Sequence, residues 1–505
     1  MKATRRDLFK FAAGGATGLL LTPAPWRLVT DAALWSENWP GIPKPVRGEL
    51  RTRFTHCALC PAGCAVKARC VGDQPISLIG LPGKPLCAFG LMGHQLPYHA
   101  GRVRQADADA VRAVIAKRAA NETVAVLDLR PGRTASWTYR RAMAALPRGV
   151  YLAARSSVPA VNLDAVKIIL SLGVPVLDGW GTPSNVQQAR SHFRLIQAEP
   201  AESRTALLAD QWLKIRPGTE LELVEALATG RGGAGTGLNE KVIASVANEL
   251  VQAGALFLAA EESPSVLELN RKLGAVGKTI VAQREAPVPR SWKPAPVTPI
   301  NSVPERSIGV LLIDESAADS YVPWSKLEGK LAPDALVVTF ASSQAGYGRQ
   351  AKHLLPTAVY PESTGDIPPA IDSPLATFRL TTPLVAPPRG VVNPAQFIGG
   401  LAAIDAADAL RERAGAIHAA GRGSVCTYAD GRSIPVEDIQ PDQFWKALND
   451  GACWIDEPGG KLLPPVLRAS TPAVVALNWE KRAARGPMPP LVSKLYQESN
   501  LRVRI

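Results

Sequence analysis

Short apolar runs alternate with helix-like stretches along most of this chain. Each run holds about six residues, which suits a buried strand better than a helix. Apolar residues at helical spacing cover residues 137–146, and residues 165–176 pass from a helical to a strand-like pattern. Strands that alternate with helices are typical of parallel sheets with crossover helices, so the pattern predicts an α/β fold. The expected strands lie at residues 123–128, 255–260, 308–313 and 335–340.

The composition indicates a folded chain of several domains. Of the 505 residues, 46% are hydrophobic and 20% are charged, which argues against a wholly disordered protein. The length suggests roughly three domains. Seven cysteines are too few for a scaffold held together by disulfides. The proline-rich stretch 286–305 predicts a stiff linker between two α/β segments.

The N-terminus has a charged start followed by a short apolar stretch. Arg5 and Arg6 precede residues 11–21, which are too few to cross a bilayer as a helix. A twin arginine before such a stretch is typical of a Tat export signal over residues 1–30, and the alternative is an ordinary amphipathic N-terminus. No clean A-x-A cleavage site follows, so the segment could remain as an anchor. The expected location is therefore the periplasmic side of the cytoplasmic membrane.

The net charge narrows the range of partners. Lys and Arg number 57 and Asp and Glu number 44, which gives +13. Nucleic acid is not an expected partner, because no basic run with interleaved aromatic residues stands out. A basic face could dock an acidic cytochrome or anionic lipid headgroups, and the alternative is scattered surface charge.

Four cysteines carry most of the chemical information. Cys57, Cys60, Cys64 and Cys87 follow the pattern C-x2-C-x3-C-x22-C. Three thiolates close together and a distant fourth suit the four iron atoms of a [4Fe–4S] cluster. A c-type haem would need His after Cys60 where Pro61 stands, zinc fits the x3 spacing poorly, and disulfides are a further alternative. The pattern predicts one [4Fe–4S] cluster held by these cysteines.

The other three cysteines lie outside this pattern. Cys70 is expected to be a small core residue. Cys426 and Cys453 could form a disulfide after export, which the sequence alone does not decide.

The export signal and the cysteine pattern, followed by Tyr98-His-Ala-Gly-Arg102-Val, resemble the start of the catalytic subunits of the molybdopterin oxidoreductase (DMSO reductase) superfamily. Similar stretches follow in order to about residue 400, at residues 168–181, 209–219, 269–278 and 354–366. The resemblance implies a small N-terminal iron–sulfur domain, then Rossmann-like parallel-sheet α/β domains and a truncated C-terminal domain. If a pterin cleft is retained, the resemblance assigns to it Asp178, Gly179, Trp180, Arg216, Pro217, Gly218, Ser342 and Gln344.

The departures from this superfamily are equally informative. Members with bis-pterin molybdenum usually have Lys or Arg two residues after the fourth cysteine, where this chain has Phe89. No cysteine occurs between Cys87 and Cys426, so none is available there as a molybdenum ligand. Ser156 and Ser157 lie roughly where a serine ligand would stand, although a surface turn is the other interpretation. About 100 residues follow Gly400, with little of the regular strand spacing of a closing β-barrel.

The predicted organisation follows from these patterns. The segments are a signal or anchor (1–30), a [4Fe–4S] domain (46–105), a molybdopterin-oxidoreductase-like α/β domain (106–285), a linker (286–305), a second α/β segment (306–405) and a C-terminal docking region (406–505). In the last, residues 442–454 and 491–502 resemble parts of iron–sulfur subunits of the Qrc-type menaquinone reductase and alternative complex III. Leu491, Leu495 and Tyr496 have helical spacing and could dock on a partner.

The sequence therefore predicts an iron–sulfur electron-transfer or scaffold subunit without molybdenum, in a periplasmic quinone-linked respiratory complex. The resemblance implies a ferredoxin-like iron–sulfur subunit, a multihaem cytochrome c and an integral membrane quinone-binding subunit as partners. One alternative is a catalytic bis-molybdopterin guanine dinucleotide oxidoreductase acting on a small substrate, with Ser156 or Ser157 on the metal. Another is a purely structural subunit without a cluster. Whether the chain has its own catalytic centre stays open at this point.

Overall fold

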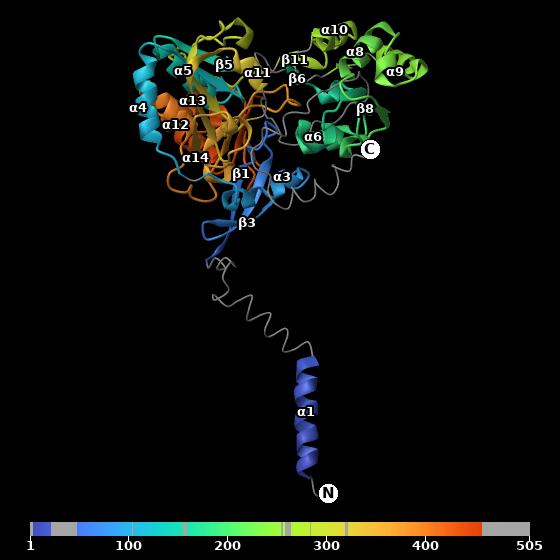
Figure 1. Cartoon of the computed structure of the whole chain (residues 1–505), viewed down its shortest axis with the longest axis vertical. Helices are drawn as coiled ribbons and strands as arrows, with labels where there is room; N and C mark the ends of the chain where they lie inside the picture. The colour runs from blue at the N-terminus through green and yellow to red at the C-terminus, as the bar shows by residue number, and fades with distance from the viewer. Residues whose placement is uncertain are drawn as a thin grey trace. The chain divides into compact units, whose positions relative to one another are not determined.

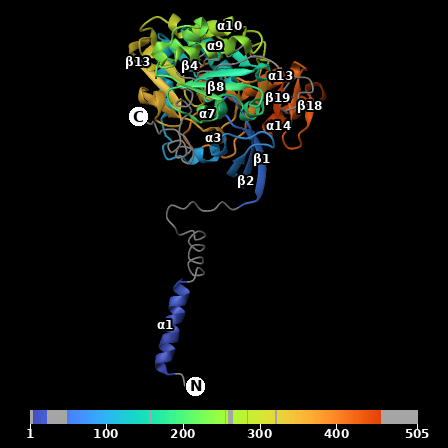
Figure 2. The same cartoon turned by 90° about the vertical axis from the view of Figure 1, so that its right-hand side faces the viewer.

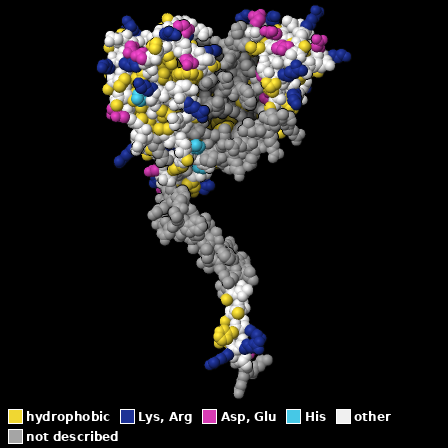
Figure 3. All heavy atoms as spheres, viewed as in Figure 1, with side chains coloured by type: hydrophobic (Ala, Val, Ile, Leu, Met, Phe, Trp, Pro, Cys, Tyr) yellow, Lys and Arg dark blue, Asp and Glu magenta, His cyan; other side chains and the backbone are white. Residues whose placement is uncertain are grey.

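The computed structural model describes residues 4–21 and 48–456, with gaps at 104, 155–158, 254–255, 258–263, 283 and 319–321. The chain forms two units, Met1–Arg51 and Thr52–Ile505 (Figure 1). The first contains helix α1 (Arg5–Leu21). Apolar side chains such as Phe9 and Phe11 are exposed on α1 near basic ones (Figure 3). Among the described residues, no helix combines the length and apolarity needed to cross a membrane.

The main sheet of the second unit has five parallel strands and is buried on both faces. Alternate residues of β4 point to opposite faces: Val124 and Val126 pack with α4, α5 and α12, whereas Ala125 and Leu127 pack with α11. Burial of both faces explains why its strands read as continuous apolar runs. The strand order is β14 (His353–Pro356), β13 (Leu331–Ala341), β12 (Ile308–Asp314), β4 (Thr123–Asp128) and β5 (Gly149–Ala153). The helices are α4 (Ala108–Ala119), α5 (Thr134–Ala145), α12 (Pro394–Gly400) and α11 (Trp324–Glu328).

The strands expected at residues 123–128, 308–313 and 335–340 are confirmed as β4, β12 and part of β13. Helix α5 begins at Thr134, three residues before the predicted start. Both carboxylate oxygens of Asp366 accept hydrogen bonds from the Thr134 backbone N–H, at 2.8 and 2.9 Å. A carboxylate at a helix N-terminus is favourable, and this one comes from more than 200 residues away, so local pattern could not reveal it.

A second parallel sheet follows in the chain. Its order is β10 (Leu256–Phe257), β7 (Ile168–Leu172), β8 (Arg194–Glu199) and β9 (Gln211–Lys214). One face packs on α8 (Glu220–Thr229), α9 (Glu240–Ala253) and α10 (Pro264–Lys272), and the other on α6 (Pro183–Ala189). The helical start predicted at residue 165 is wrong: only Ala165, the last residue of the 3-10 turn η2 (Leu163–Ala165), is helical before β7 begins at Ile168. Of the strand expected at 255–260, Leu256–Phe257 is seen and residues 255 and 258–260 lie outside the described residues.

The chain leaves the first sheet after β5 and returns to it at β12. The predicted segments 106–285 and 306–405 therefore share one sheet. The proline-rich stretch between them packs against that sheet: Trp292 and Ala295 are buried, and the Thr298 N–H donates to the Tyr151 carbonyl at 2.9 Å. This stretch is thus part of the packed body next to β5.

A third, antiparallel sheet joins residues on both sides of position 405. Its order is β15 (Gly365–Ile367), β16 (Thr377–Thr381), β19 (Cys453–Ile455), β17 (Ser424–Cys426) and β18 (Ser433–Pro435). Helices α13 (Ala406–Ala419) and α14 (Pro441–Asn449) lie beside it and cover Phe378 and Trp454 (Figure 2). The tail motif at 442–454 thus forms α14 and β19, while residues 491–502 lie outside the described residues.

The remaining elements are short. A three-stranded sheet holds β1 (Leu50–His56), β2 (Ala65–Val71) and β3 (Gln74–Ile79), and α3 (Ala88–Leu91) and η1 (Gly93–Tyr98) follow it. Strands β6 (Pro159–Val161) and β11 (Ile280–Ala282) pair with each other. The other helical turns are η3 (Val176–Trp180), α7 (Arg204–Leu207), η4 (Ala234–Thr236), η5 (Ile300–Ser302), η6 (Gly346–Arg349), η7 (Tyr360–Glu362) and η8 (Val436–Asp438).

Candidate functional site

The four cysteines of the sequence pattern lie on two neighbouring loops. Cys57, Cys60 and Cys64 occupy the connection between β1 and β2, and Cys87 is the N-cap residue that directly precedes α3. The first loop closes on itself, because the Cys57 N–H donates to the Cys64 carbonyl at 2.9 Å. Gly63 has φ +55°, a left-handed conformation that favours glycine.

These cysteines are close enough to act on one another electrostatically. Burial raises the pKa of the Cys64 thiol, and Cys60, Cys57 and Cys87 raise it further. All four are thiols in the structure. Among the described residues, no group of three or more His, Cys, Asp or Glu side chains could hold a single metal ion. A [4Fe–4S] cluster binds each cysteine through a different iron atom, so its ligands need not converge on one point.

Two buried arginines hold the backbone of the first cysteine loop. Arg379 of β16 donates through Nη1 to the carbonyl oxygens of Ala62 and Gly63, both at 2.9 Å. Arg130 donates to the carbonyl oxygens of Ala58, at 2.6 Å, and Leu59, at 3.1 Å. Four carbonyl groups between Cys57 and Cys64 therefore accept hydrogen bonds from buried cations. A Cβ at Gly63 would lie 2.8 Å from Arg379 Nη1, so only glycine leaves room for this contact.

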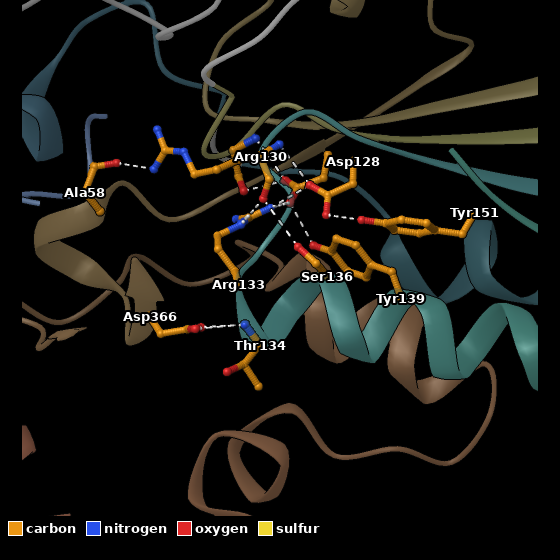
Figure 4. A network of polar contacts seen from close by, with 11 residues as sticks. Ala58, Asp128, Arg130, Arg133, Thr134, Ser136, Tyr139, Tyr151 and Asp366 are labelled. Carbon is orange, nitrogen blue, oxygen red and sulfur yellow. Dashed lines mark hydrogen bonds and ion pairs between the residues drawn. The ribbon is translucent and has the colours of Figure 1, made fainter. Parts of the chain in front are cut away.

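Arg130 belongs to a buried charge network at the carboxyl ends of β4 and β12 (Figure 4). Arg133 donates to Asp128 at 3.1 Å, to Asp314 at 2.8 Å and to the carbonyl of Arg130 at 2.9 Å. Burial alone would raise the pKa of Asp314. The charge of Arg133, together with hydrogen bonds from Ser316, Arg133 and Tyr139, holds this pKa below its ordinary value. The network thus fixes Arg130, and through it the cysteine loop, to the edge of the main sheet.

Apolar and aromatic side chains cover the cysteines. Phe89 is buried and packs with Leu59 and Cys87. The Tyr360 hydroxyl lies against Cys57: burial raises its pKa and the thiol raises it further. Within the described part of the chain this buried hydroxyl lacks a geometrically good hydrogen-bond partner. A Cβ at Gly93 would lie 2.0 Å from that oxygen, so Gly93 is needed for Tyr360 to sit there.

A small cavity of about 160 Å³ lies beside the cysteine loop. Its lining includes Gly63 and Cys64 from the cysteine loop, the cations Lys84 and Arg379, and Cys453. Burial lowers the pKa of Lys84. The cavity is smaller than the ~300 Å³ at which drug-sized ligand pockets begin.

The other predicted site residues lie at the carboxyl edges of the two parallel sheets. Asp178, Gly179 and Trp180 form η3 after β7, Arg216, Pro217 and Gly218 follow β9, and Ser342 and Gln344 follow β13. Trp180 is buried, Ser342 is half-buried, and Arg216 through Gly218 and Gln344 are exposed. Ser156 and Ser157 lie outside the described residues. The structure therefore brings the four cysteines together but leaves these residues on three separate loops.

Three residues near the cysteines were missed by sequence reasoning. Arg130 follows a predicted strand, where polar side chains often serve a site, and could have been noted for that reason. Arg379 and Tyr360 carry no local signal, because each reaches the cysteine loop from about 300 residues away.

No protein-family model matches this chain. A curated relative, the molybdopterin-binding-like subunit of menaquinone reductase from Nitratidesulfovibrio vulgaris, is 25% identical over an alignment that covers 45% of this chain and 40% of the relative. The match thus spans about two fifths of that protein's length. Acetylene hydratase from Pelobacter acetylenicus has a similar structure, with a TM-score of 0.51 and 14% identity over 88% of this chain and 81% of the hydratase. The chain therefore has a mixed α/β fold of the molybdopterin-oxidoreductase kind, and the resemblance seen in its sequence is confirmed.

Proposed function

We propose that this chain is an iron–sulfur electron-transfer and scaffold subunit of a membrane-associated, quinone-linked respiratory complex. One observation carries the proposal: four cysteines on two neighbouring loops lie together under an apolar cover, with two arginines holding the loop backbone. A [4Fe–4S] cluster bound there would supply one-electron transfer. The curated relative is named as a subunit of menaquinone reductase, which supports a quinone-linked assembly.

The residues around the cysteines suit an electron relay. Arg130 and Arg379 place positive charge behind the loop and fix its carbonyl groups, so the thiolates would be held without rearrangement. Phe89 and Leu59 place apolar surface next to Cys87. Net charge and burial around the sulfurs help to set the potential of such a cluster, and both the nearby Arg379 and the burial of the thiols are present here.

The same residues argue against molybdenum chemistry. The resemblance places a cation that bridges cluster and pterin two residues after Cys87, and this chain has the buried Phe89 there. An apolar side chain offers no hydrogen bond to a pterin. We therefore propose that the α/β body is a scaffold, with a catalytic bis-molybdopterin guanine dinucleotide enzyme that uses Ser156 or Ser157 as the alternative.

Localisation and partners follow from the same proposal. Arg5 and Arg6 in the exposed first turn of α1 would direct Tat export, and the chain would act on the periplasmic side of the membrane. Its partners would be a ferredoxin-like iron–sulfur subunit, a multihaem cytochrome c and an integral membrane quinone-binding subunit.

The experiment is anaerobic purification of the affinity-tagged full chain from its native membranes, followed by metal and haem analysis. We expect iron, co-purifying c-type haem and a membrane subunit, and no molybdenum or tungsten. Stoichiometric molybdenum or tungsten would favour the catalytic alternative. Recovery of the chain alone after mild detergent extraction would contradict membership of a complex.

A further inference from the structure

Two cysteines outside the predicted cluster lie opposite each other on neighbouring strands of the antiparallel sheet. Strands β17 and β19 are antiparallel neighbours, and their register places Cys426 directly opposite Cys453. Both side chains are buried in one small apolar cluster with Ile455, against Leu375 and Tyr428. The two thiols therefore occupy the same face of the sheet.

This placement meets the geometric needs of a disulfide. Directly opposed residues of an antiparallel pair have Cα atoms about 4.5–5.5 Å apart, and disulfides join Cα atoms about 4.4–6.8 Å apart. The strands on both sides hold the register, since β19 also pairs with β16 and β17 with β18. A bond between the two sulfurs would need little backbone movement.

One of the two thiols is reachable from the cavity beside the cysteine loop. Cys453 lines that cavity together with Lys84 and Arg379. Burial raises the pKa of Cys453 to about 12, while Arg379 and Lys84 act to lower it. Two cations at the thiol favour the thiolate that attacks a disulfide, and burial keeps its fraction low, so exchange would be slow and selective.

We propose that Cys426 and Cys453 form a two-electron dithiol–disulfide couple. Oxidation removes two electrons and two protons from the pair and forms one S–S bond. The oxidant is a small disulfide or a disulfide-bearing protein: its S–S bond breaks, and its two sulfurs leave as thiols that carry those electrons and protons. The proposal does not depend on whether the four other cysteines hold a cluster.

The couple is connected to the cysteine loop through hydrogen bonds. Tyr428 contacts Cys453, and its hydroxyl lies 3.0 Å from Nε2 of His56. The other ring nitrogen of His56 lies 2.9 Å from the Leu380 carbonyl and must donate to it, so Nε2 of the neutral ring accepts from Tyr428. His56 directly precedes Cys57. Disulfide formation would remove the thiol beside Tyr428 and tie β17 to β19 next to this loop.

The test uses the purified full-length protein, equilibrated anaerobically in oxidised and reduced glutathione buffers of graded potential. Thiols are then blocked by alkylation, and the chain is digested without reduction. We expect a Cys426–Cys453 linked peptide pair, about 2 Da lighter than the two thiol peptides, that rises through a single two-electron transition and disappears with dithiothreitol. Cys70, which is buried opposite Pro75, is the internal control and should remain alkylated throughout.

A second arm uses diamide, a small two-electron oxidant, so that slow exchange with glutathione does not decide the outcome. Cys426→Ser should abolish the linked pair and leave Cys70 unchanged. Thiols that persist at Cys426 and Cys453 under both oxidants would overturn the proposal. Linkage of either residue to one of the four loop cysteines in preference to its opposite partner would overturn it equally.

Discussion

Arg379 donates a hydrogen bond of 2.9 Å to the carbonyl oxygen of Gly63, a residue 316 positions earlier in the chain. The contact joins the antiparallel sheet near the C-terminus to the cysteine loop near the N-terminus. Because the guanidinium is buried and also bonds the carbonyl of Ala62, the loop cannot rearrange without leaving a buried cation poorly paired.

Replacing Arg379 by Gln should weaken cluster binding more than folding. Each lost charge-assisted hydrogen bond costs about 1.5–3 kcal/mol, and removing a positive charge should make the cluster potential more negative. The measurements are the rate of iron loss to a chelator, expected to rise several-fold, and an EPR-monitored redox titration. Arg389→Gln, at an exposed arginine, is the matched control. Equal iron loss in both variants would contradict the assigned role.

Replacing Tyr360 by Phe should change the cluster potential with little effect on stability. The hydroxyl lies against Cys57, where it would donate to the sulfur of a bound cluster, and hydrogen bonds to sulfur raise the potential. The same titration should therefore give a more negative midpoint for Tyr360→Phe. Tyr98→Phe, at a tyrosine that is 56% exposed, should leave the midpoint unchanged. A midpoint for Tyr360→Phe that matches the parent would refute this contact.

Replacing Arg102 by Met should strongly destabilise the fold. Arg102 and Glu362 form a buried ion pair with two N···O distances of 2.7 Å, and removing one partner of such a pair costs about 3–5 kcal/mol. The measurement is the free energy of unfolding in urea. The double variant Arg102→Met, Glu362→Leu should recover most of the loss, and Arg271→Met at an exposed pair should cost less than about 1 kcal/mol. A double variant as unstable as the single one would show that the ion pair is not the cause.

Stability should fall as the pH rises from about 4.5 to about 7, because burial raises the pKa of Glu315 over that range. Burial raises the pKa of this carboxyl to about 7, so between its ordinary value and 7 the folded chain holds a proton that the unfolded chain releases. Its contribution, roughly 3 kcal/mol, is absent below about pH 4.5 and opposes folding fully above about pH 7. Unfolding curves from pH 5 to 8 should lose this slope in Glu315→Gln. Glu328→Gln, at an exposed position, should keep it, and a slope that survives Glu315→Gln would contradict the assignment.

Local pattern predicted β4, β12 and part of β13 in the five-stranded parallel sheet, but it predicted neither β5 nor β14, and it did not predict how the strands connect. Strand β12 was recognised because both faces are buried and every residue from Ile308 to Asp314 is inside. That the chain leaves this sheet after β5 and returns at β12 is not visible in any local pattern, because it depends on which strands pair. The same holds for β16 and β19, which lie on either side of the boundary expected at residue 405.

The residues of the candidate site also fall into those that the sequence could predict and those that it could not. Spacing alone selected Cys57, Cys60, Cys64 and Cys87, since a cluster needs several sulfurs from a short stretch of chain. The groups that hold their loop, Arg130 and Arg379, act through backbone carbonyls, which impose no pattern on the sequence. Asp366 is a further example, because its carboxylate accepts a hydrogen bond from the Thr134 N–H at the start of α5 and only the fold brings the two residues together.

The central claim is that four cysteines hold one [4Fe–4S] cluster. The most direct test is iron and acid-labile sulfide analysis of the anaerobically purified chain, with low-temperature EPR after reduction, for the parent, Cys64→Ser and Cys70→Ser. We predict about four iron and four sulfide per chain, and an EPR signal after reduction, in the parent and in Cys70→Ser. In Cys64→Ser, the iron content and the EPR signal should both be lower. Absence of iron in the parent, or equal iron and an identical signal in Cys64→Ser, would contradict the claim.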